Sequence, residues 1–205
     1  MEKKFSYNGL TIHLHPEVYE PAEDTFLMLE AISVKQNDKV FEIGTGCGII
    51  ALSCAQKGAD VVCSDINPYA VELTKKNYEV NKKLIKGSFE VRKGNLFTVV
   101  EKDEKFDVII FNPPYLPTTQ DELVGGSGWF DVATDGGKNG LDVTLRFLDE
   151  VKNHLEGNRE SFFVFSSLSN EELLRDCIKK NGLRARVIRK CRFYDEEIRI
   201  IGLTF

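Results

Sequence analysis

The stretch KVFEIGTGCG, residues 39–48, decides the fold. Residues 39–43 read as a strand, glycines follow at once, and residues 49–57 have a helical pattern. A strand that passes through a glycine turn into a helix is the repeating unit of a parallel sheet, because parallel strands need a crossover connection. The stretch therefore predicts an α/β fold.

The rest of the chain alternates in the same way. Further strands are expected at residues 60–64, 89–92, 107–111 and 161–165, and further helices at residues 69–81, 141–155 and 170–181. Residues 184–193 and 197–205 are expected to form a closing hairpin around Tyr194-Asp195-Glu196. This order predicts a parallel sheet with helices on both faces and an antiparallel C-terminal hairpin.

Length and charge limit the classes of protein. The 205 residues are 42% apolar and 29% charged, so we expect one domain over residues 1–205, with residues 1–20 as an N-terminal extension. The net charge of −5 argues against a protein whose main task is to bind nucleic-acid backbone, since that task needs clustered Lys and Arg. Nucleic acid is therefore an unfavoured partner.

The cysteines suggest neither a metal site nor disulfides. No CxxC pair occurs and only three histidines accompany the five cysteines, so a reduced, cytoplasmic location is expected. The N-terminus lacks the apolar core of a secretion signal, and no stretch approaches the roughly 20 apolar residues of a membrane span. We expect no membrane association. The cysteines are Cys47, Cys54, Cys63, Cys177 and Cys191.

Ligands of parallel sheets bind beyond the carboxyl ends of the strands, and the first loop there is EIGTGCG, residues 42–48. Its glycines let the backbone approach a ligand closely. A dinucleotide fingerprint requires G-x-G-x-x-G, but here the third glycine comes one residue early. Glu42 is well placed to hold a positively charged group. The structural alternative is a tight turn with a partly exposed Glu.

The second loop begins at Asp65, where the second strand ends. An acidic residue at this position can accept hydrogen bonds from both hydroxyls of a ribose. Its structural alternative is the N-cap of the helix that starts at Pro68, but Asn67 is the better placed cap. Glu42 and Asp65 together predict a nucleoside bound across the first two strands.

The third loop is NPPY, residues 112–115, directly after an apolar strand. A lone Pro-Pro pair most simply ends a strand. However, each proline holds the residue before it extended, so the Asn112 side-chain oxygen and the Pro113 carbonyl can be fixed side by side. Tyr115 supplies a face for a flat group. The loop predicts a clamp for a planar NH2 group.

The motifs EIGTGCG, SDIN and NPPY, in this order, resemble those of S-adenosylmethionine-dependent methyltransferases of the Rossmann-like class. With YEPAEDTF, residues 19–26, the chain is similar over about residues 10–205 to the HemK family of protein N5-glutamine methyltransferases, in its archaeal and eukaryotic release-factor branch. The resemblance implies a seven-stranded, mostly parallel sheet. It also implies S-adenosylmethionine as cofactor and, as substrate, the glutamine of a Gly-Gly-Gln loop in a translation termination factor.

The resemblance also assigns roles to residues. Glu42, Gly44 and Gly46 would hold the methionine part of the cofactor, and Asp65 its ribose. Ile66 would lie beside the adenine, with Asn95 accepting from its amino group where relatives have Asp. Thr25 would close over the methionine tail, although residues 21–26 also fit a capped helix start. The full cofactor set is Thr25, Glu42, Gly44, Gly46, Asp65, Ile66, Asn95, Leu96 and Asn112.

The expected chemistry is displacement of a methyl group from sulfur by nitrogen. An amide nitrogen is a poor nucleophile, so alignment of its N–H bonds on oxygens of Asn112 and Pro113 is the main catalytic tool. Asn112, Pro113 and Tyr115 are the predicted catalytic residues. No general base is required in the methyl step.

Two other functions remain open on sequence alone. The same clamp could hold the exocyclic amine of adenine in DNA or RNA, with Tyr115 stacked on a flipped base. A basic stretch over residues 184–192 could serve it, although a solvated strand face explains that stretch more simply. A cofactor-binding scaffold without activity is the second alternative, and the intact NPPY argues against it.

The last predictions concern the substrate groove and a partner. Residues 124–140 are rich in glycine and are expected to form a lid or groove, with Gly136-Gly137 beside the substrate; Trp129 receives no role. The resemblance implies a small zinc-binding activator subunit on an apolar edge of the sheet. The candidate contacts are Val61, Val62, Phe89 and Val91.

Overall fold

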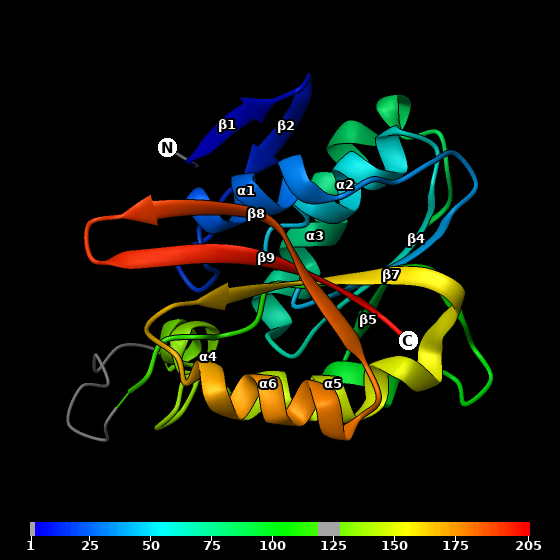
Figure 1. Ribbon diagram of the computed structural model, residues 1–205. Coiled ribbons are helices and arrows are strands. Elements are labelled where there is room, and N and C mark those ends of the chain that lie inside the picture. The colour runs from blue at the N-terminus through cyan, green and yellow to red at the C-terminus, as the bar shows by residue number, and fades with distance from the viewer. Residues whose placement is uncertain (1–2, 119–127) are drawn as a thin grey trace.

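The protein is described here by a computed structural model covering residues 3–118 and 128–205. Its centre is a twisted sheet (Figure 1). The strands of this sheet are β3 (Lys39–Ile43), β4 (Asp60–Asp65), β5 (Phe89–Lys93), β6 (Phe106–Phe111), β7 (Leu155–Ser166), β8 (Arg184–Phe193) and β9 (Glu196–Thr204). They lie in the order β5-β4-β3-β6-β7-β9-β8. The predicted seven-stranded sheet is confirmed.

The pairing is parallel from β5 to β7, and β9 is antiparallel to both of its neighbours. From β3 the chain adds β4 and β5 on one side and then returns to add β6 and β7 on the other side, so the strand order reverses between β3 and β6. In open α/β sheets, ligands bind at such a switch point, beyond the carboxyl ends of the strands. The predicted antiparallel C-terminal hairpin is β8–β9, and it extends the sheet on the side of β7.

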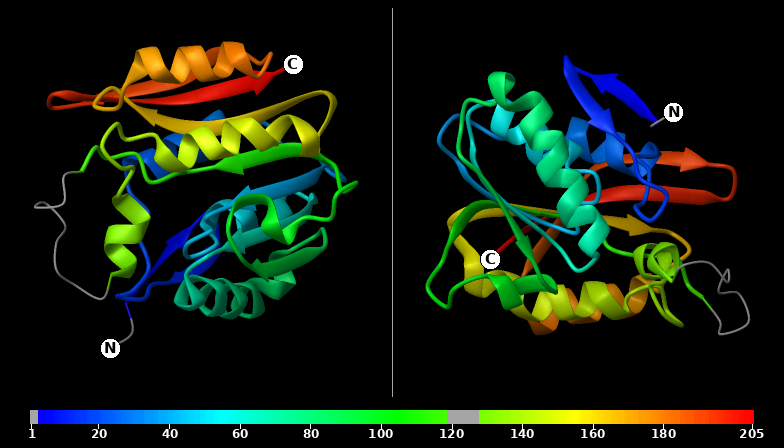
Figure 2. Two further views of the ribbon diagram at one scale, coloured as in Figure 1. Left: turned by 90° about the horizontal axis from the view of Figure 1, so that it is seen from below. Right: turned by 180° about the vertical axis from the view of Figure 1, so that it is seen from behind.

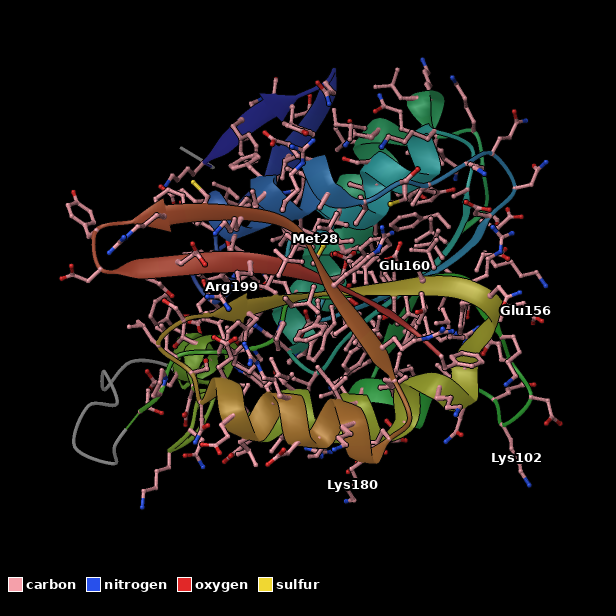
Figure 3. The ribbon with its side chains drawn as sticks, viewed as in Figure 1. Met28, Lys102, Glu156, Glu160, Lys180 and Arg199 are labelled. Carbon is pink, nitrogen blue, oxygen red and sulfur yellow. The ribbon has the colours of Figure 1, made fainter. Side chains whose placement is uncertain are left out.

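Helices cover both faces of the sheet (Figures 1 and 2). One face carries α1 (Glu23–Ala31), α2 (Ile49–Gln56) and α3 (Pro68–Asn81), and the other carries α5 (Asp142–His154) and α6 (Glu171–Lys180). Each face has its own apolar core. Met28 lies in the first core and Phe147 in the second, and both are fully buried. Figure 3 shows Met28 in the interior, whereas Lys102 and Lys180 project outward.

Three short helical segments lie in the connections between the main elements. They are η1 (Lys82–Leu84), η2 (Leu96–Val99) and α4 (Trp129–Thr134). The bounds of α2 and α3 differ by at most one residue from the helices predicted at residues 49–57 and 69–81. Asn67 is the N-cap of α3 and accepts a hydrogen bond from the Tyr69 backbone N–H at 2.9 Å, with Pro68 in the first turn.

An N-terminal hairpin, β1 (Lys4–Tyr7) and β2 (Leu10–His13), packs on the α2 and α3 side of the sheet (Figure 2). Residues 1–20 were expected to be an N-terminal extension, and this hairpin was not predicted. Two amides of α3 hold it: Asn81 exchanges two hydrogen bonds with the backbone of Thr11, and Asn77 does the same with His13. The hairpin leads the chain directly to the segment before α1.

The strand predicted at residues 161–165 is longer than expected. β7 begins at Leu155, immediately after α5. Leu155 is buried, but residues 156–159 are exposed and include no apolar side chain. Its pairing with β6 shifts register between Phe106 and Val108, which leaves a bulge at this end. The early part of β7 therefore carries no apolar pattern from which it could be predicted.

The basic stretch of residues 184–192 lies on β8, the edge strand of the sheet. Arg186 pairs with Glu160 at 2.9 Å, and Lys190 pairs with Glu197 at 3.1 Å. Figure 3 labels Glu160 on β7. Charged residues on an edge strand discourage pairing with another sheet, so the simpler explanation of this stretch fits the structure.

Gly87, just before β5, is required by close packing. A Cβ at this position would lie 1.8 Å from the carbonyl oxygen of Ala59. We expect Gly87→Ala to lower the free energy of unfolding by at least about 2 kcal/mol, because the backbone on one side must move. Urea denaturation followed by circular dichroism measures the loss. Lys86→Ala, at the exposed neighbour, should change it by less than about 0.5 kcal/mol, and an equal loss in both variants would contradict the packing argument.

Among residues 3–118 and 128–205, no helix combines the length and apolarity that crossing a membrane requires. The five cysteines are free thiols, and Cys47, Cys54 and Cys63 are buried. Burial raises the pKa of the Cys47 thiol to about 12, so this group stays protonated and unreactive at neutral pH.

Candidate active site

A cavity of about 360 Å³ opens where β3, β4 and β6 end. It is lined by the loops that follow these strands, by the segment before α1, and by α4. Every residue predicted to be catalytic or to bind the cofactor lines this one cavity. The switch point of the sheet therefore brings together residues that are up to 90 positions apart in the chain, from Thr25 to Tyr115.

Glu42 is the last residue but one of β3 and is buried, with 3% of its surface exposed. Its Oε2 accepts hydrogen bonds from the Thr45 hydroxyl at 2.7 Å and the Ala51 backbone N–H at 3.0 Å. Burial raises the pKa of Glu42 to about 8, against these two hydrogen bonds, which lower it. The alternative of a partly exposed Glu is wrong. A buried carboxyl group of this kind gains most from a cationic ligand.

The glycine loop bends back toward the second strand. Gly44 and Gly46 both have positive φ, 67° and 57°, which a residue with a side chain rarely adopts. This conformation directs the Gly46 backbone N–H to Asp65 Oδ2 at 2.9 Å and the Thr45 N–H to the Ser64 carbonyl at 2.9 Å. The loop thus joins the ends of β3 and β4.

Asp65 stands at the end of β4 and is buried. Besides the bond from Gly46, its Oδ1 accepts the Asn67 backbone N–H at 2.9 Å. Burial raises the pKa of Asp65, and the backbone donors oppose that shift. Since Asn67 caps α3, Asp65 is not needed as the cap. A carboxylate has about four acceptor positions, so both oxygens can also accept from hydroxyl groups of a ligand.

Ile66, Asn95 and Leu96 also line the cavity. Ile66 is 43% exposed, an unusual position for a large apolar side chain. Leu96 has a positive φ of 49° and is buried where η2 begins. The apolar side chains of Ile66 and Leu96 and the amide of Asn95 together fit a flat heterocycle that carries a polar edge.

Asn112 begins the third loop, directly after β6. Its Nδ2 donates to Asp24 Oδ2 at 2.9 Å. Its Oδ1 is buried and has no hydrogen-bond partner among the residues that the structure describes. A buried acceptor without a partner is costly and rare, and in a cavity wall it indicates a group that a ligand completes.

The backbone of the third loop is fixed from behind. The Ser169 hydroxyl donates to the Tyr115 carbonyl at 2.8 Å, and Leu116 exchanges backbone hydrogen bonds with residues 134 and 136. A Cβ on Gly140 would lie 2.5 Å from that same Tyr115 carbonyl, so only glycine fits there. The prolines and these contacts leave the loop little freedom.

The predicted groove over residues 124–140 is a helix in part. Residues 124–127 lie outside the described residues, and α4 occupies residues 129–134. Trp129, which received no role from the sequence, and Val132 line the cavity. Gly136 and Gly137 instead pack tightly: a Cβ on Gly137 would lie 2.0 Å from an oxygen of Asp142. Their visible role is to close a turn behind the cavity wall.

Comparison with known proteins shows the family to which this chain belongs. Residues 10–126 match the family described as "Methyltransferase small domain". MJ0928 of Methanocaldococcus jannaschii, provisionally named a protein N5-glutamine methyltransferase, is 41% identical over 195 residues, which are 95% of each chain. The chain belongs to this methyltransferase family. Human methyltransferase HEMK2 is 31% identical, over 92% of this chain and 90% of its own.

A solved structure supports the fold. The Mtq2–Trm112 complex of E. cuniculi, described as responsible for methylation of the termination factor eRF1, superposes with a TM-score of 0.68 at 22% identity. The match covers 92% of this chain and 98% of that one. At this identity the likeness speaks for the fold alone. The family and the Rossmann-like fold class expected from the sequence are both confirmed.

One residue of this methyltransferase cavity was missed by the sequence analysis. Asp24, in the first turn of α1, is 3% exposed and bonds to the third loop. The acidic pair Glu23-Asp24 also fits a helix start, where the dipole favours negative charge. That explanation suits Glu23, but it gives no reason for the burial of Asp24.

Proposed function

We propose that this chain transfers a methyl group from S-adenosylmethionine to the side-chain amide nitrogen of a glutamine in a Gly-Gly-Gln loop of a translation termination factor. The observation that carries the proposal is the Asn112 side chain, with one edge bound to Asp24 and a buried Oδ1 without a partner among the described residues. That oxygen matches an N–H of a primary amide. Two relatives that match most of this chain are named as glutamine methyltransferases, which supports the same acceptor.

The cofactor is S-adenosylmethionine, and the cavity residues fit its parts. The Glu42 carboxylate suits the ammonium group, and the positive-φ glycines admit the methionine backbone closely. Asp65 suits the ribose hydroxyls. Ile66 and Leu96 suit the two faces of the adenine, with Asn95 at its amino edge. Thr25 lies on the same wall, beside Asp24. When bound, the cofactor supplies a methyl group on a positively charged sulfur.

The catalytic contribution of the chain is alignment. In our proposal the Asn112 Oδ1 and the Pro113 carbonyl accept the two N–H bonds of the glutamine amide. This contact turns the nitrogen toward the methyl donor and favours the positive charge that the nitrogen develops. Tyr115 borders the amide plane. The glycines beside the target glutamine would let its side chain enter the narrow cavity.

The test is a methyl-transfer assay with radiolabelled cofactor. The substrates are the intact termination factor, the same factor with its Gly-Gly-Gln glutamine changed to alanine, unmodified tRNA and duplex DNA. We expect label in the first substrate alone. Label in nucleic acid alone would overturn the proposal in favour of adenine methylation, the less supported alternative. Mass spectrometry of the labelled peptide locates the methyl group on the glutamine.

We also propose that a small zinc-binding activator subunit binds at the β5 edge of the sheet, and that residues 1–205 act as one methyltransferase domain in the cytoplasm, where termination factors work. The complex formed by Mtq2 with Trm112 supports a small partner. Of the predicted contacts, Val61 is in the core, 1% exposed, and is excluded. Val62, Phe89 and Val91 are half-buried near the edge. The backbone of β5 pairs on one side only.

Beside this edge, α3 and η1 expose two apolar side chains. Val80 is 51% exposed and Leu84 is 41% exposed, and α3 packs on β5. We expect the double variant Val80→Glu, Leu84→Glu to weaken binding of the activator at least about tenfold, because it puts charge on an apolar contact. Calorimetric titration of the purified partners measures this.

The free energy of unfolding of this variant alone should change by less than about 1 kcal/mol, since both positions are exposed. The matched control is Lys179→Glu with Lys180→Glu, at the end of α6 on the opposite face, which should bind normally. Normal binding by the Val80, Leu84 variant would place the partner elsewhere.

A further inference from the structure

Asp24 is the centre of a hydrogen-bond network in the wall of the cavity. Its Oδ2 accepts from Asn112 Nδ2 at 2.9 Å and from the Tyr115 hydroxyl at 3.2 Å. Its Oδ1 accepts from the backbone N–H and hydroxyl of Thr25, at 2.6 and 3.2 Å, and from the Tyr19 hydroxyl at 3.5 Å. All of these residues line the cavity. One buried carboxylate thus joins the segment before β3 to the third loop.

We propose that Asp24 is a positioning residue. It fixes the side-chain amide of Asn112 so that the oxygen, and not the NH2 group, faces the substrate amide nitrogen that receives the methyl group. This inference rests on the function proposed above. The amide of an asparagine has two edges of nearly equal shape, one a donor and one an acceptor. An ionised carboxylate accepts only. Next to Asp24, the donor edge of Asn112 is the one that can bind.

This orientation of the Asn112 amide explains why its oxygen has no partner among the described residues. With Nδ2 on Asp24, the Oδ1 of Asn112 is left buried without a partner among the described residues. Without the carboxylate, nothing in the described surroundings would select this orientation over the reverse. In the reverse orientation, an NH2 group would meet the NH2 group of the acceptor, and two donors repel. Asp24 therefore excludes an unproductive arrangement.

The carboxylate also strengthens the exposed acceptor. An amide whose N–H donates to a negative group becomes more polarised, and its oxygen becomes a better acceptor. Tyr115 donates to the same oxygen of Asp24, so the two side chains of the third loop are held relative to each other. Tyr19 and Thr25 fix the carboxylate from its other side. The network is anchored on α1 rather than on the loop.

The first test is Asp24→Asn, which keeps the shape and removes the charge. We expect kcat on the termination factor to fall at least about tenfold, because both orientations of Asn112 become accessible. The Kd for S-adenosylmethionine and the KM for the factor should stay within about threefold of wild type. Asp38→Asn is the matched control: Asp38 is also buried, but it caps the Lys35 backbone N–H away from the cavity. Its kcat should be unchanged.

The second test exchanges the two groups. In Asp24→Asn with Asn112→Asp, the amide at position 24 donates to the carboxylate at position 112, which then presents an oxygen to the acceptor. We expect this double variant to be at least about tenfold more active than Asn112→Asp alone, in which two carboxylates would meet and share a proton. A merely structural role for Asp24 gives no such recovery.

A third measurement needs neither cofactor nor substrate. In the free wild-type protein, the side-chain NH2 of Asn112, assigned by comparison with Asn112→Ala, should give sharp nitrogen–proton NMR signals with slow hydrogen exchange. In Asp24→Asn these signals should broaden or exchange faster. Wild-type kcat in Asp24→Asn, a kcat loss matched by an equal loss of cofactor affinity, or no recovery in the double variant would overturn the inference. A wild-type protein that methylates no termination factor would instead reject the proposed function, and the NMR comparison would still test Asp24.

Discussion

Asn112→Ala is expected to reduce methyl transfer at least about 100-fold while the chain stays folded and binds S-adenosylmethionine with near wild-type affinity. The reason is that the lost Oδ1 contact matters most when the acceptor nitrogen becomes positively charged, and one such contact at the transition state contributes on the order of 3 kcal/mol. The Pro113 carbonyl remains but is one acceptor for two N–H bonds. Single-turnover transfer with saturating cofactor measures the chemical step, and calorimetry measures the affinity.

Asn181→Ala is the matched control for this prediction. Asn181 lies at the end of α6, where its side chain donates a hydrogen bond to Asp149. It is not among the residues that line the cavity. Its rate of transfer should equal that of wild type. Near-normal methylation by Asn112→Ala would show that the acceptor amide is held elsewhere.

The central fold could be predicted because its signals are local. Apolar runs, glycine turns and the Asn67-Pro68 helix start each lie within a few residues, and together they specify strand, turn and helix. The N-terminal hairpin was missed because its stability is not local. Its turn is Asn8-Gly9, both with positive φ, which is a strong hairpin signal. However, its strands have four residues each, and the amides that hold it are 64 and 70 positions away on α3.

The site could be predicted in part for a similar reason. Glu42, Asp65 and Asn112 each follow a strand, and the topology of a parallel sheet brings such positions together without further information. Asp24 follows no strand of the sheet. Its bond to Asn112 joins residues 88 positions apart, and its place in the sequence, at a helix start, has an ordinary explanation. Sequence position after a strand therefore identified the residues on the cofactor side of the cavity, but it did not identify Asp24, which holds the Asn112 side chain on the acceptor side.

Binding of S-adenosylmethionine is expected to tighten as the pH rises from about 6 to 7.5, with up to about tenfold gain in affinity per pH unit. In the free protein, burial raises the pKa of Glu42 to about 8, so the group is mostly protonated over this range. A cationic ammonium group beside it favours the carboxylate, so binding must release that proton. Calorimetry in two buffers of different ionisation enthalpy counts the released protons. We expect close to one at pH 6.5.

Glu42→Gln separates this effect from Asp65, whose pKa is also raised by burial. The variant should bind at least about tenfold more weakly at pH 7.5, with little pH dependence below that value, because the amide carries no proton to lose. The pH dependence of the free energy of unfolding, measured without cofactor, is an independent test. The pKa of Glu42 in the folded protein lies above the ordinary value of 4.5 for a glutamate. Its contribution to the free energy of unfolding is therefore complete below about pH 4.5, declines as the pH rises, and is lost above about pH 8. The Gln variant should lack this decline. An unchanged pH slope in both binding and unfolding would show that Glu42 is already ionised in the free protein, and that its carboxylate is stabilised by more than the two hydrogen bonds from Thr45 and Ala51.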